Sequence, residues 1–384
     1  MKDKAYITGS VLKWSRETAK LSIDQVARTM KKDPASIAAW ENEADYPTIK
    51  QAEKLSEMYK RALAVFFLPV PPKDFDTLKD FRGKNEQRDF STALTFYIRE
   101  LQQKQNWLIE QLESDREEEL KFLGKFALNS KVIEIANDIK NEIGFDSLKN
   151  LKEPLRDLIN KVEQKRIFVS LSSNFHSRSL LNTAEVRGFA ICDKLAPFIF
   201  INTADSKNGQ LFTLMHELAH LWLNSSGISN IDFRESLNSI YDPIEILCNE
   251  VAAEILMPIR LIREAFKGKN ITIDLISNFS KEINVSSFAL AVRLLKNNLI
   301  KNEFFYHIKS IFEKRYNEFL KKEESKEKTG TPSPFLLQVR KNSRAFSNYV
   351  YQNYKSGRIN GAEASSLLKI KINNFSRMER YLFV

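Results

Sequence analysis

Hydrophobic and polar residues follow a helical period along most of the chain. Three regions show this period, with charged residues on their predicted outer faces: residues 8–68, 89–165 and 243–316. Short runs rich in β-branched and aromatic residues predict three strands, at residues 167–169, 188–191 and 198–201. A long helix is predicted after them, from about residue 208 to residue 224. The sequence therefore predicts a mainly α-helical protein with a small β-sheet, an α+β fold.

Breaks in this pattern divide the chain into parts. Prolines end the first helical region at residues 69–72, and charge, Gly and Pro accumulate between residues 321 and 334, as they do in linkers. We therefore expect five parts: a helical domain at 1–72, a helical connecting region at 73–165, a domain with the sheet and the long helix at 166–320, a linker at 321–334, and a small basic helical domain at 335–384.

Composition narrows the class of protein. A chain of 384 residues with 43% hydrophobic content is longer than one core usually grows, which favours several domains. Cys192 and Cys248 both lie in apolar segments, so buried thiols are expected rather than a disulfide framework. The start of the chain lacks the apolar core of a signal peptide, and no run of about 18 apolar residues could span a bilayer. We expect a cytoplasmic protein with no membrane partner.

The net charge of +10 is distributed unevenly. Residues 301–384 hold 17 Lys or Arg against 8 Glu and no Asp, whereas residues 1–60 carry 11 basic and 9 acidic groups. A basic end favours an anionic partner such as nucleic acid. A solvated, lysine-rich surface explains the same charge, so both interpretations stay open.

The predicted long helix carries a pattern typical of metal chemistry. His216 and His220 are four residues apart, so their imidazoles share one helical face and can bind one ion, while Glu217 lies beside them and can act on bound water. On a helical wheel the few polar residues of this segment form one narrow wedge that contains no Lys or Arg. A buried helix whose polar groups point into a cleft fits this wedge better than a surface helix does.

A catalytic metal site commonly has three protein ligands, so a third is expected from elsewhere. Residues 242–256 begin with an N-cap and a first-turn proline, and this predicted helix carries three glutamates: Glu245, Glu250 and Glu254. Only Glu245 shares the apolar, inward face of the helix, although it could instead be the acid of a capping box. Asn249, one turn further on, could orient a ligating histidine.

The runs FTLMHELAHLWL and IEILCNEVAAEILMP, with VRGFAICDKLAPFIFIN before them, resemble the ImmA/IrrE family of metallopeptidases over roughly residues 165–300. The resemblance implies a gluzincin-like site in which Zn²⁺ is held by His216, His220 and Glu245. Glu217 would then be the general base. The ligand types admit Mn²⁺ as well as Zn²⁺.

The same resemblance implies a place for the substrate. Residues 198–201 would be an edge strand on which an extended peptide could lie by strand addition, along Phe198, Phe200 and Asn202. Peptide cleavage also needs a donor to the developing oxyanion. Three side chains are candidates, and the sequence assigns the role to none of them: Arg234, Tyr241 and His307.

Residues 8–68 resemble the helix-turn-helix of XRE-type regulators, with SIDQVARTM, ASIAAWENE and YPTIKQAEKLSEMY in the expected order. The helix that should enter the major groove departs from the pattern. Direct readout needs Arg, Lys, Asn or Gln near its start, and this helix offers Pro34, Ala35 and Ser36. Weak DNA binding and protein docking both stay open, and Ile37 and Trp40 are predicted to be core residues.

The resemblance to the ImmA/IrrE family implies a regulatory zinc endopeptidase that cleaves a cytoplasmic protein such as a repressor or an antitoxin. One alternative is a DNA-binding transcriptional regulator whose peptidase fold serves only to bind a partner. Another is a stress or phage-defence protease triggered by nucleic acid at the basic C-terminus, where tyrosines among Lys and Arg could stack on bases. Tyrosines at this spacing can equally form a helical core.

Overall fold

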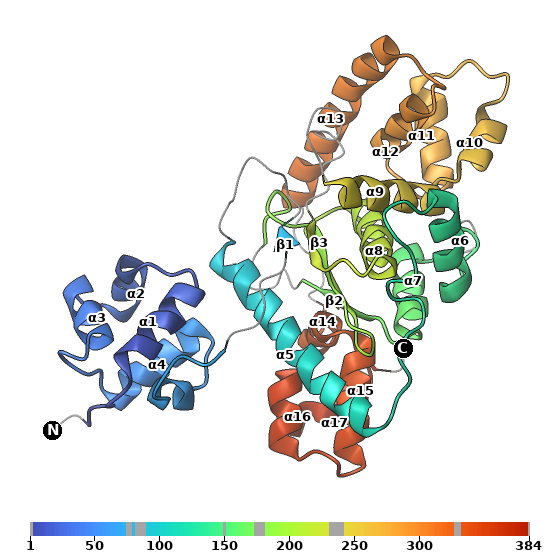
Figure 1. Cartoon of the computed structure of the whole chain (residues 1–384). Coiled ribbons are helices and arrows are strands. Elements are labelled where there is room, and N and C mark those ends of the chain that lie inside the picture. Colours follow the sequence, from blue (N-terminus) through green and yellow to red (C-terminus); the bar gives the residue numbers. More distant parts are fainter. Residues whose placement is uncertain are drawn as a thin grey trace. The chain divides into compact units, whose positions relative to one another are not determined.

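The chain divides into two compact units. The computed structural model describes residues 3–73, 79–80, 90–148, 151–172, 181–229, 242–325 and 332–382. The N-terminal unit comprises residues 1–77 and 87–103, and the large unit comprises residues 78–86 and 104–384 (Figure 1). Helices predominate in the described chain, and the sheet is small, which confirms the predicted fold class.

The N-terminal unit is built from short helices with strong caps. Its elements are α1 (Gly9–Thr18), α2 (Ile23–Met30), α3 (Pro34–Glu41), α4 (Ile49–Tyr59), the 3₁₀ turn η1 (Leu63–Phe67) and the first part of α5 (Thr92–Ser114). Ser22 and Thr48 each form a capping box with the glutamine three residues later, at α2 and α4. Asp33 caps α3 by accepting a hydrogen bond from the backbone N–H of Ala35.

A small apolar core holds these helices together. Ile37 and Trp40 are buried in it, which confirms that α3 uses these residues for packing. A buried ion pair joins α1 to the end of α3, since the Arg16 guanidinium donates to both carboxylate oxygens of Glu41 at 2.7 and 3.0 Å. Gly9 permits this close approach, because a Cβ there would lie 2.4 Å from the carbonyl oxygen of Glu41.

The large unit contains a five-stranded sheet with the strand order β1-β5-β3-β4-β2. The strands are β1 (Lys79–Asp80), β2 (Phe168–Leu171), β3 (Gly188–Ile191), β4 (Phe198–Ile201) and β5 (Gly227–Ser229). β3 runs antiparallel to both of its neighbours, while β2 runs parallel to β4 and β1 runs parallel to β5. Stacked rings tie adjacent strands together: Phe168 on Phe198, and Phe189 on Phe200.

The prediction that residues 198–201 form an open edge strand for a substrate peptide is wrong. β4 pairs with β3 on one side and with β2 on the other, so it has no open edge for a peptide. Phe198, Phe200 and Asn202 are all fully buried, and the Asn202 amide donates to the carbonyl oxygens of Leu181 and Val186. A continuous apolar run is typical of a strand that is covered on both faces, whereas exposed edge strands tend to carry charged residues.

Helices pack around this sheet and form the main core. α8 (Lys207–Trp222) lies against β3 and β4, and α9 (Pro243–Leu256) and α6 (Val132–Ile143) pack against α8. Every residue of α8 from Gln210 to Trp222 is buried, as expected for a helix that is apolar nearly all round. The remaining helices of this region are α7 (Pro154–Glu163), α10 (Ile259–Phe266), α11 (Ile273–Glu282), α12 (Ser287–Lys296) and α13 (Asn302–Ser325).

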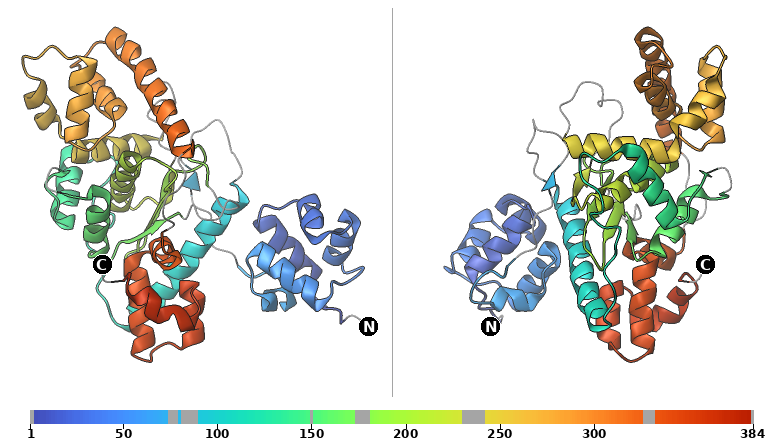
Figure 2. Two further views of the ribbon diagram at one scale, coloured as in Figure 1. Left: turned by 180° about the vertical axis from the view of Figure 1, so that it is seen from behind. Right: turned by 45° about the vertical axis from the view of Figure 1, so that its right-hand side comes forward.

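The C-terminal segment is helical and packs on the large unit. It comprises α14 (Pro334–Asn342), α15 (Arg344–Lys355), α16 (Gly361–Leu368), η3 (Ile372–Asn374) and α17 (Phe375–Glu379). α14 and α15 pack against β2, and the segment also lies beside the second part of α5 in both views of Figure 2. The ring of Tyr351 is buried against that of Phe375, so this tyrosine belongs to the core of the segment.

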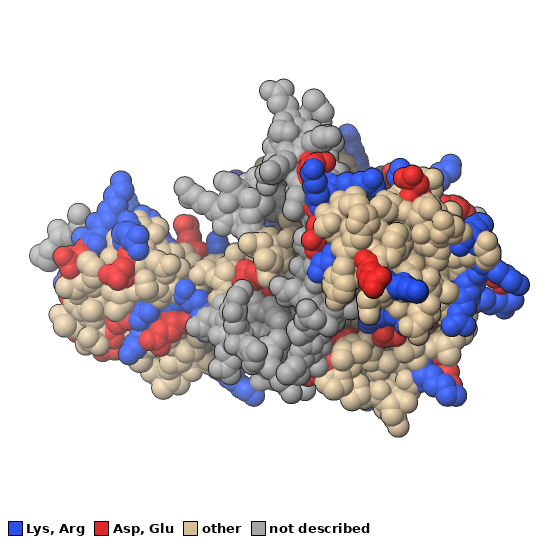
Figure 3. Space-filling model, turned by 90° about the horizontal axis from the view of Figure 1, so that it is seen from above, with Lys and Arg blue, Asp and Glu red and all other residues tan. Residues whose placement is uncertain are grey.

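The surface carries both signs of charge. On the face shown in Figure 3, Lys and Arg side chains are interspersed with Asp and Glu among the described residues. No described helix is both long enough and apolar enough to cross a membrane. Cys248 is buried and Cys192 is partly buried, and both are free thiols. Burial raises the pKa of Cys192 to about 12, which keeps this thiol protonated at neutral pH.

Candidate metal centre

Two helices that pack against each other, α8 and α9, bring the predicted metal-binding residues together. The Ser206 side chain caps α8 by accepting from the Gly209 N–H, and the far end is held where the Trp222 indole N–H donates to Asp138. Asp242 caps α9 through the N–H of Ile244. Both helices therefore begin at a capping side chain, and the residues that follow are held in place by packing.

His216, His220 and Glu245 converge in the interior. The two imidazole Nε2 atoms lie 2.9 Å apart, and the Glu245 carboxylate oxygens lie 3.3 Å from His216 Nε2 and 3.0 Å from His220 Nε2. All three side chains are buried. In a tetrahedral zinc site with bonds of about 2.0–2.1 Å, neighbouring donor atoms are about 3.3 Å apart. The spacing and the chemistry of this donor set therefore fit a metal ion.

The electrostatics of the three groups favour a metal at neutral pH. Burial lowers the pKa of His216, although the nearby Glu245 carboxylate opposes this effect. Burial alone would raise the pKa of Glu245, but the two histidines outweigh it and lower this pKa to about 2. The carboxylate is thus ionised and the His216 ring is neutral, which are the forms that bind a metal.

The other two glutamates of α9 face elsewhere. Glu254 forms a buried ion pair with Arg293 of α12, and Glu250 pairs with Lys296 at 3.1 Å on the surface. The helical wheel separated these residues from Glu245 in the same way. The amide of Asn249 interacts with His216 and partly opposes the lowering of its pKa, so Asn249 also lies at the centre.

Glu217 lies at the interface between α8 and the sheet. Its side chain is fully buried, and an added Cβ at Gly188 would lie 3.0 Å from Glu217 Oε1 and 2.4 Å from Thr213 Cγ2. Gly188 is therefore required for β3 to pass this close to the motif helix. The metal-binding motif does not point to Gly188, although a glycine at the start of a strand can indicate a close backbone approach.

Only one of the three oxyanion candidates belongs to the described part of the chain, and it does not lie at this centre. His307 lies on an exposed face of α13, and Arg234 and Tyr241 lie outside the described residues. The structure therefore assigns the role to none of them.

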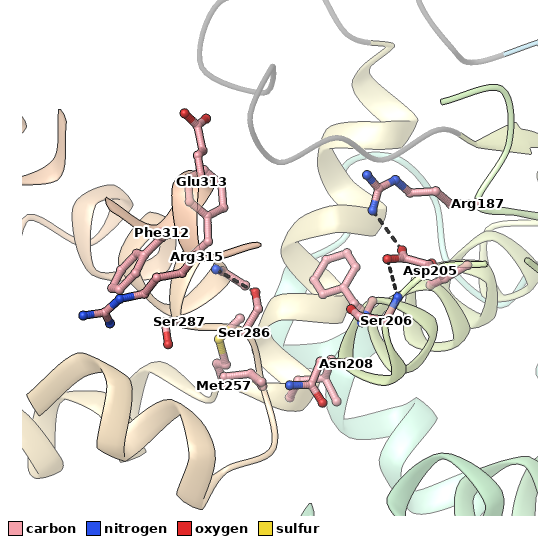
Figure 4. Close-up of a pocket in the computed structure, with 17 residues that line it drawn as sticks. Arg187, Asp205, Ser206, Asn208, Met257, Ser286, Ser287, Phe312, Glu313 and Arg315 are labelled. Atoms are coloured by element: carbon pink, nitrogen blue, oxygen red, sulfur yellow. Dashed lines mark hydrogen bonds and ion pairs between the residues drawn. The ribbon is translucent and has the colours of Figure 1, made fainter. Parts of the chain in front are cut away.

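A cavity of about 280 Å³ opens beside the first half of α8 (Figure 4). Its walls are largely apolar and include Phe212, Leu256, Met257, Phe288 and Phe312. The ring of Phe212 also faces His216, with ring centroids 6.5 Å apart, so the cavity and the metal centre share a wall. An ion pair between Arg187 and Asp205, at 2.8 Å, forms its polar rim.

Two family models match the chain. Residues 173–295 match the peptidase M78 family, described as the IrrE N-terminal-like domain, and residues 12–66 match a helix-turn-helix family. No curated protein matches the chain with significant similarity. The first match includes all the residues of the metal centre and supports a metallopeptidase-type enzyme. The resemblance drawn from the motifs is confirmed: the chain combines a region similar to the IrrE N-terminal-like peptidase domain with one similar to helix-turn-helix domains.

Proposed function

We propose that the chain is a zinc-dependent regulatory endopeptidase that cleaves a protein such as a repressor or an antitoxin. The observation that carries this proposal is the convergence of two imidazoles and one carboxylate, all buried, within a region that matches a peptidase family. His216, His220 and Glu245 would hold the ion, with Asn249 orienting His216. Histidine and carboxylate ligands favour zinc, and manganese is the alternative that metal analysis would distinguish.

The metal and Glu217 would have separate roles in cleavage. When bound, the metal would supply a Lewis acid that polarises a carbonyl and acidifies water. Glu217 would accept the proton of the attacking water and return it to the leaving amine. Its burial against β3 keeps bulk water from the carboxylate, which strengthens its interaction with a nearby proton.

The apolar cavity beside α8 offers a place for a substrate side chain. It shares Phe212 with the metal centre and lies at the N-terminal side of His216 on the helix. A peptide held there would present an apolar side chain to Phe212, Leu256 and Met257. This location replaces β4, which has no free edge.

The helix-turn-helix region supports a regulatory role, because such domains bind DNA or partner proteins. It also favours the alternative that the chain is a transcriptional regulator whose peptidase fold binds a partner without cleaving it. Substitution of Glu217 discriminates between these two functions, because cleavage requires a general base and partner binding does not.

The experiment compares the wild type with Glu217→Gln in metal content and in cleavage of cell proteins, detected as new N-termini by mass spectrometry. We expect retained metal and a loss of cleavage of about 100-fold or more. Glu250→Gln, a change on the surface of α9, serves as the control and should cleave like the wild type. Equal cleavage by the wild type and Glu217→Gln would contradict the proposal in favour of partner binding.

A further inference from the structure

A second cavity, of about 480 Å³, lies in the large unit at the end of α8 remote from His220. It is bounded by α7, by β2, by the first turn of α8 and by α14 and α15 of the C-terminal segment. None of the residues of the metal centre lines it. The cavity is thus a separate feature that the proposed peptidase function does not use.

Basic side chains from four helices converge on this cavity: Arg156, Lys207, Arg340 and Arg344. Two glutamates also line it, but they do not balance the charge. Glu153 pairs with Arg156 at 3.4 Å, and the Glu163 carboxylate accepts from the backbone N–H groups of Arg344 and Ala345 at the start of α15. Among the described residues, no carboxylate lies within ion-pair distance of Lys207 or Arg340.

The pKa shifts of these groups show that partial desolvation and neighbouring cations both act on them. Lys207 lies at the exposed mouth of the cavity, where partial desolvation and the nearby Arg340 lower its pKa against the opposing effect of Glu153. Burial lowers the pKa of Arg344, and Arg156 and Arg340 lower it further against the opposing effect of Glu163. Burial also raises the pKa of Glu163 to about 7, which weakens its compensating charge near neutral pH. A bound anion would relieve the mutual repulsion of these cations.

The rest of the cavity suits the body of an organic ligand. Its apolar wall is formed by Leu155, Ile159, Val169, Leu171 and Leu211. Three amide side chains also line it: Asn208, Asn284 and Asn160, whose Oδ1 accepts from the Arg344 guanidinium at 3.5 Å. The volume is within the range of about 300–1,000 Å³ that is typical of small-molecule sites. The first turn of α8, which begins at Lys207, adds backbone N–H groups with partial positive charge.

We propose that this cavity binds a phosphorylated small molecule such as a nucleotide, with its phosphates on Lys207, Arg340 and Arg344 and its base on the apolar wall. Phosphates fit better than a single carboxylate, because several cations from different helices match an anion with more than one charge. A cavity of this volume with an apolar wall also fits a small molecule better than a nucleic-acid backbone. The ligand would touch both the C-terminal segment and the helix that carries His216.

Isothermal titration of the full-length protein with ATP, with inorganic pyrophosphate and with a single-stranded oligonucleotide tests this site. Lys207→Gln and Arg340→Gln remove the two exposed cations that have no described carboxylate partner, so both variants should fold. Lys371→Gln and Arg377→Gln, which change exposed cations outside the cavity, are the matched controls. Thermal unfolding without ligand verifies that all four variants are folded.

We expect saturable binding of ATP that weakens about tenfold or more in each cavity variant and stays unchanged in both controls. Pyrophosphate should bind more weakly than ATP, because it cannot use the apolar wall. Absence of binding by ATP and pyrophosphate, or binding that the cavity variants leave unchanged, would overturn the proposal. Binding of the oligonucleotide alone would also overturn it and would assign the cavity to nucleic acid. All readouts are binding constants, so the result does not depend on peptidase activity.

Discussion

The helices α8 and α3 carry the two motifs of this chain, and they use their polar positions in opposite ways. α8 is buried from Gln210 onward, and its two histidines and Glu217 lie inside the large unit. α3 buries Ile37, Trp40 and Glu41 and leaves short, uncharged side chains at the exposed start of the helix. The comparison teaches that α8 places in the interior the polar groups that the proposed peptidase chemistry uses, whereas α3 uses its residues for packing and offers few side chains for reading bases.

Loss of a proposed metal ligand should have the largest effect. Zinc binding of about 10–16 kcal/mol is shared among the ligands of a structural site, so Glu245→Ala should weaken metal affinity on the order of a thousandfold. Glu250→Ala, five residues later on another face of α9, should bind metal like the wild type. Competition with a chelator, followed by metal analysis, measures both. An equal loss of metal affinity in the two variants would contradict the assignment of Glu245, and not Glu250, as a metal ligand.

The buried ion pair of the N-terminal unit should give the next largest effect. Glu41→Ala removes the buried carboxylate partner of the Arg16 guanidinium, which should lower the free energy of opening of this unit by about 3 kcal/mol. Glu17→Ala, which removes the exposed partner of the same arginine, should cost less than about 1 kcal/mol. Hydrogen exchange of the amides in residues 9–66 of the full chain measures both values. Similar values for the two variants would mean that burial of the pair does not matter.

Glu163 is a buried carboxylate whose pKa is shifted in the opposite direction from that of Glu245. Glu163 faces N–H and hydroxyl donors rather than histidines, and burial raises its pKa to about 7. Its folded-state pKa is above its ordinary value of 4.5, so the folded state binds more protons between these values. The large unit should therefore lose about 1–3 kcal/mol of stability as the pH rises from 4.5 to 7.

Glu163→Gln cannot ionise and should lack this dependence on pH. Urea unfolding of the full chain at several pH values measures the difference from the wild type. Glu142→Gln, which alters an exposed ion pair with Lys165, is the control and should follow the wild-type curve. A wild-type stability that rises over this range, with the slope absent in Glu163→Gln, would show that the pKa is lowered instead.

The smallest effect is expected at the start of α3. Ser36→Ala should change the affinity of the full chain for DNA by less than about 0.5 kcal/mol, because a lone short hydroxyl supplies little direct readout. Fluorescence anisotropy with labelled duplexes at fixed salt concentration measures this change. A loss of about 1–3 kcal/mol for one sequence alone would indicate base recognition and would break the comparison with α8.

Local patterns predicted the parts of this protein whose cause is local. The capped helices, the burial of Ile37 and Trp40, and the choice of Glu245 among three glutamates all follow from side chains that share one face of one helix. The position of β4 does not follow from such a pattern. An apolar run indicates a buried strand, but the strands that pair with it, β2 and β3, are chosen by the packing of the whole sheet.

The sequence by itself determined that His216, Glu217 and His220 would lie in one polar wedge of a buried helix, because helical geometry sets their positions around the helix axis. Only the tertiary structure decided that Glu245 reaches both histidines, that Gly188 lets β3 approach Glu217, and that four basic side chains from separate helices meet in one cavity. These juxtapositions join residues far apart in the chain. They depend on how helices and strands pack against one another, which no period along the sequence encodes.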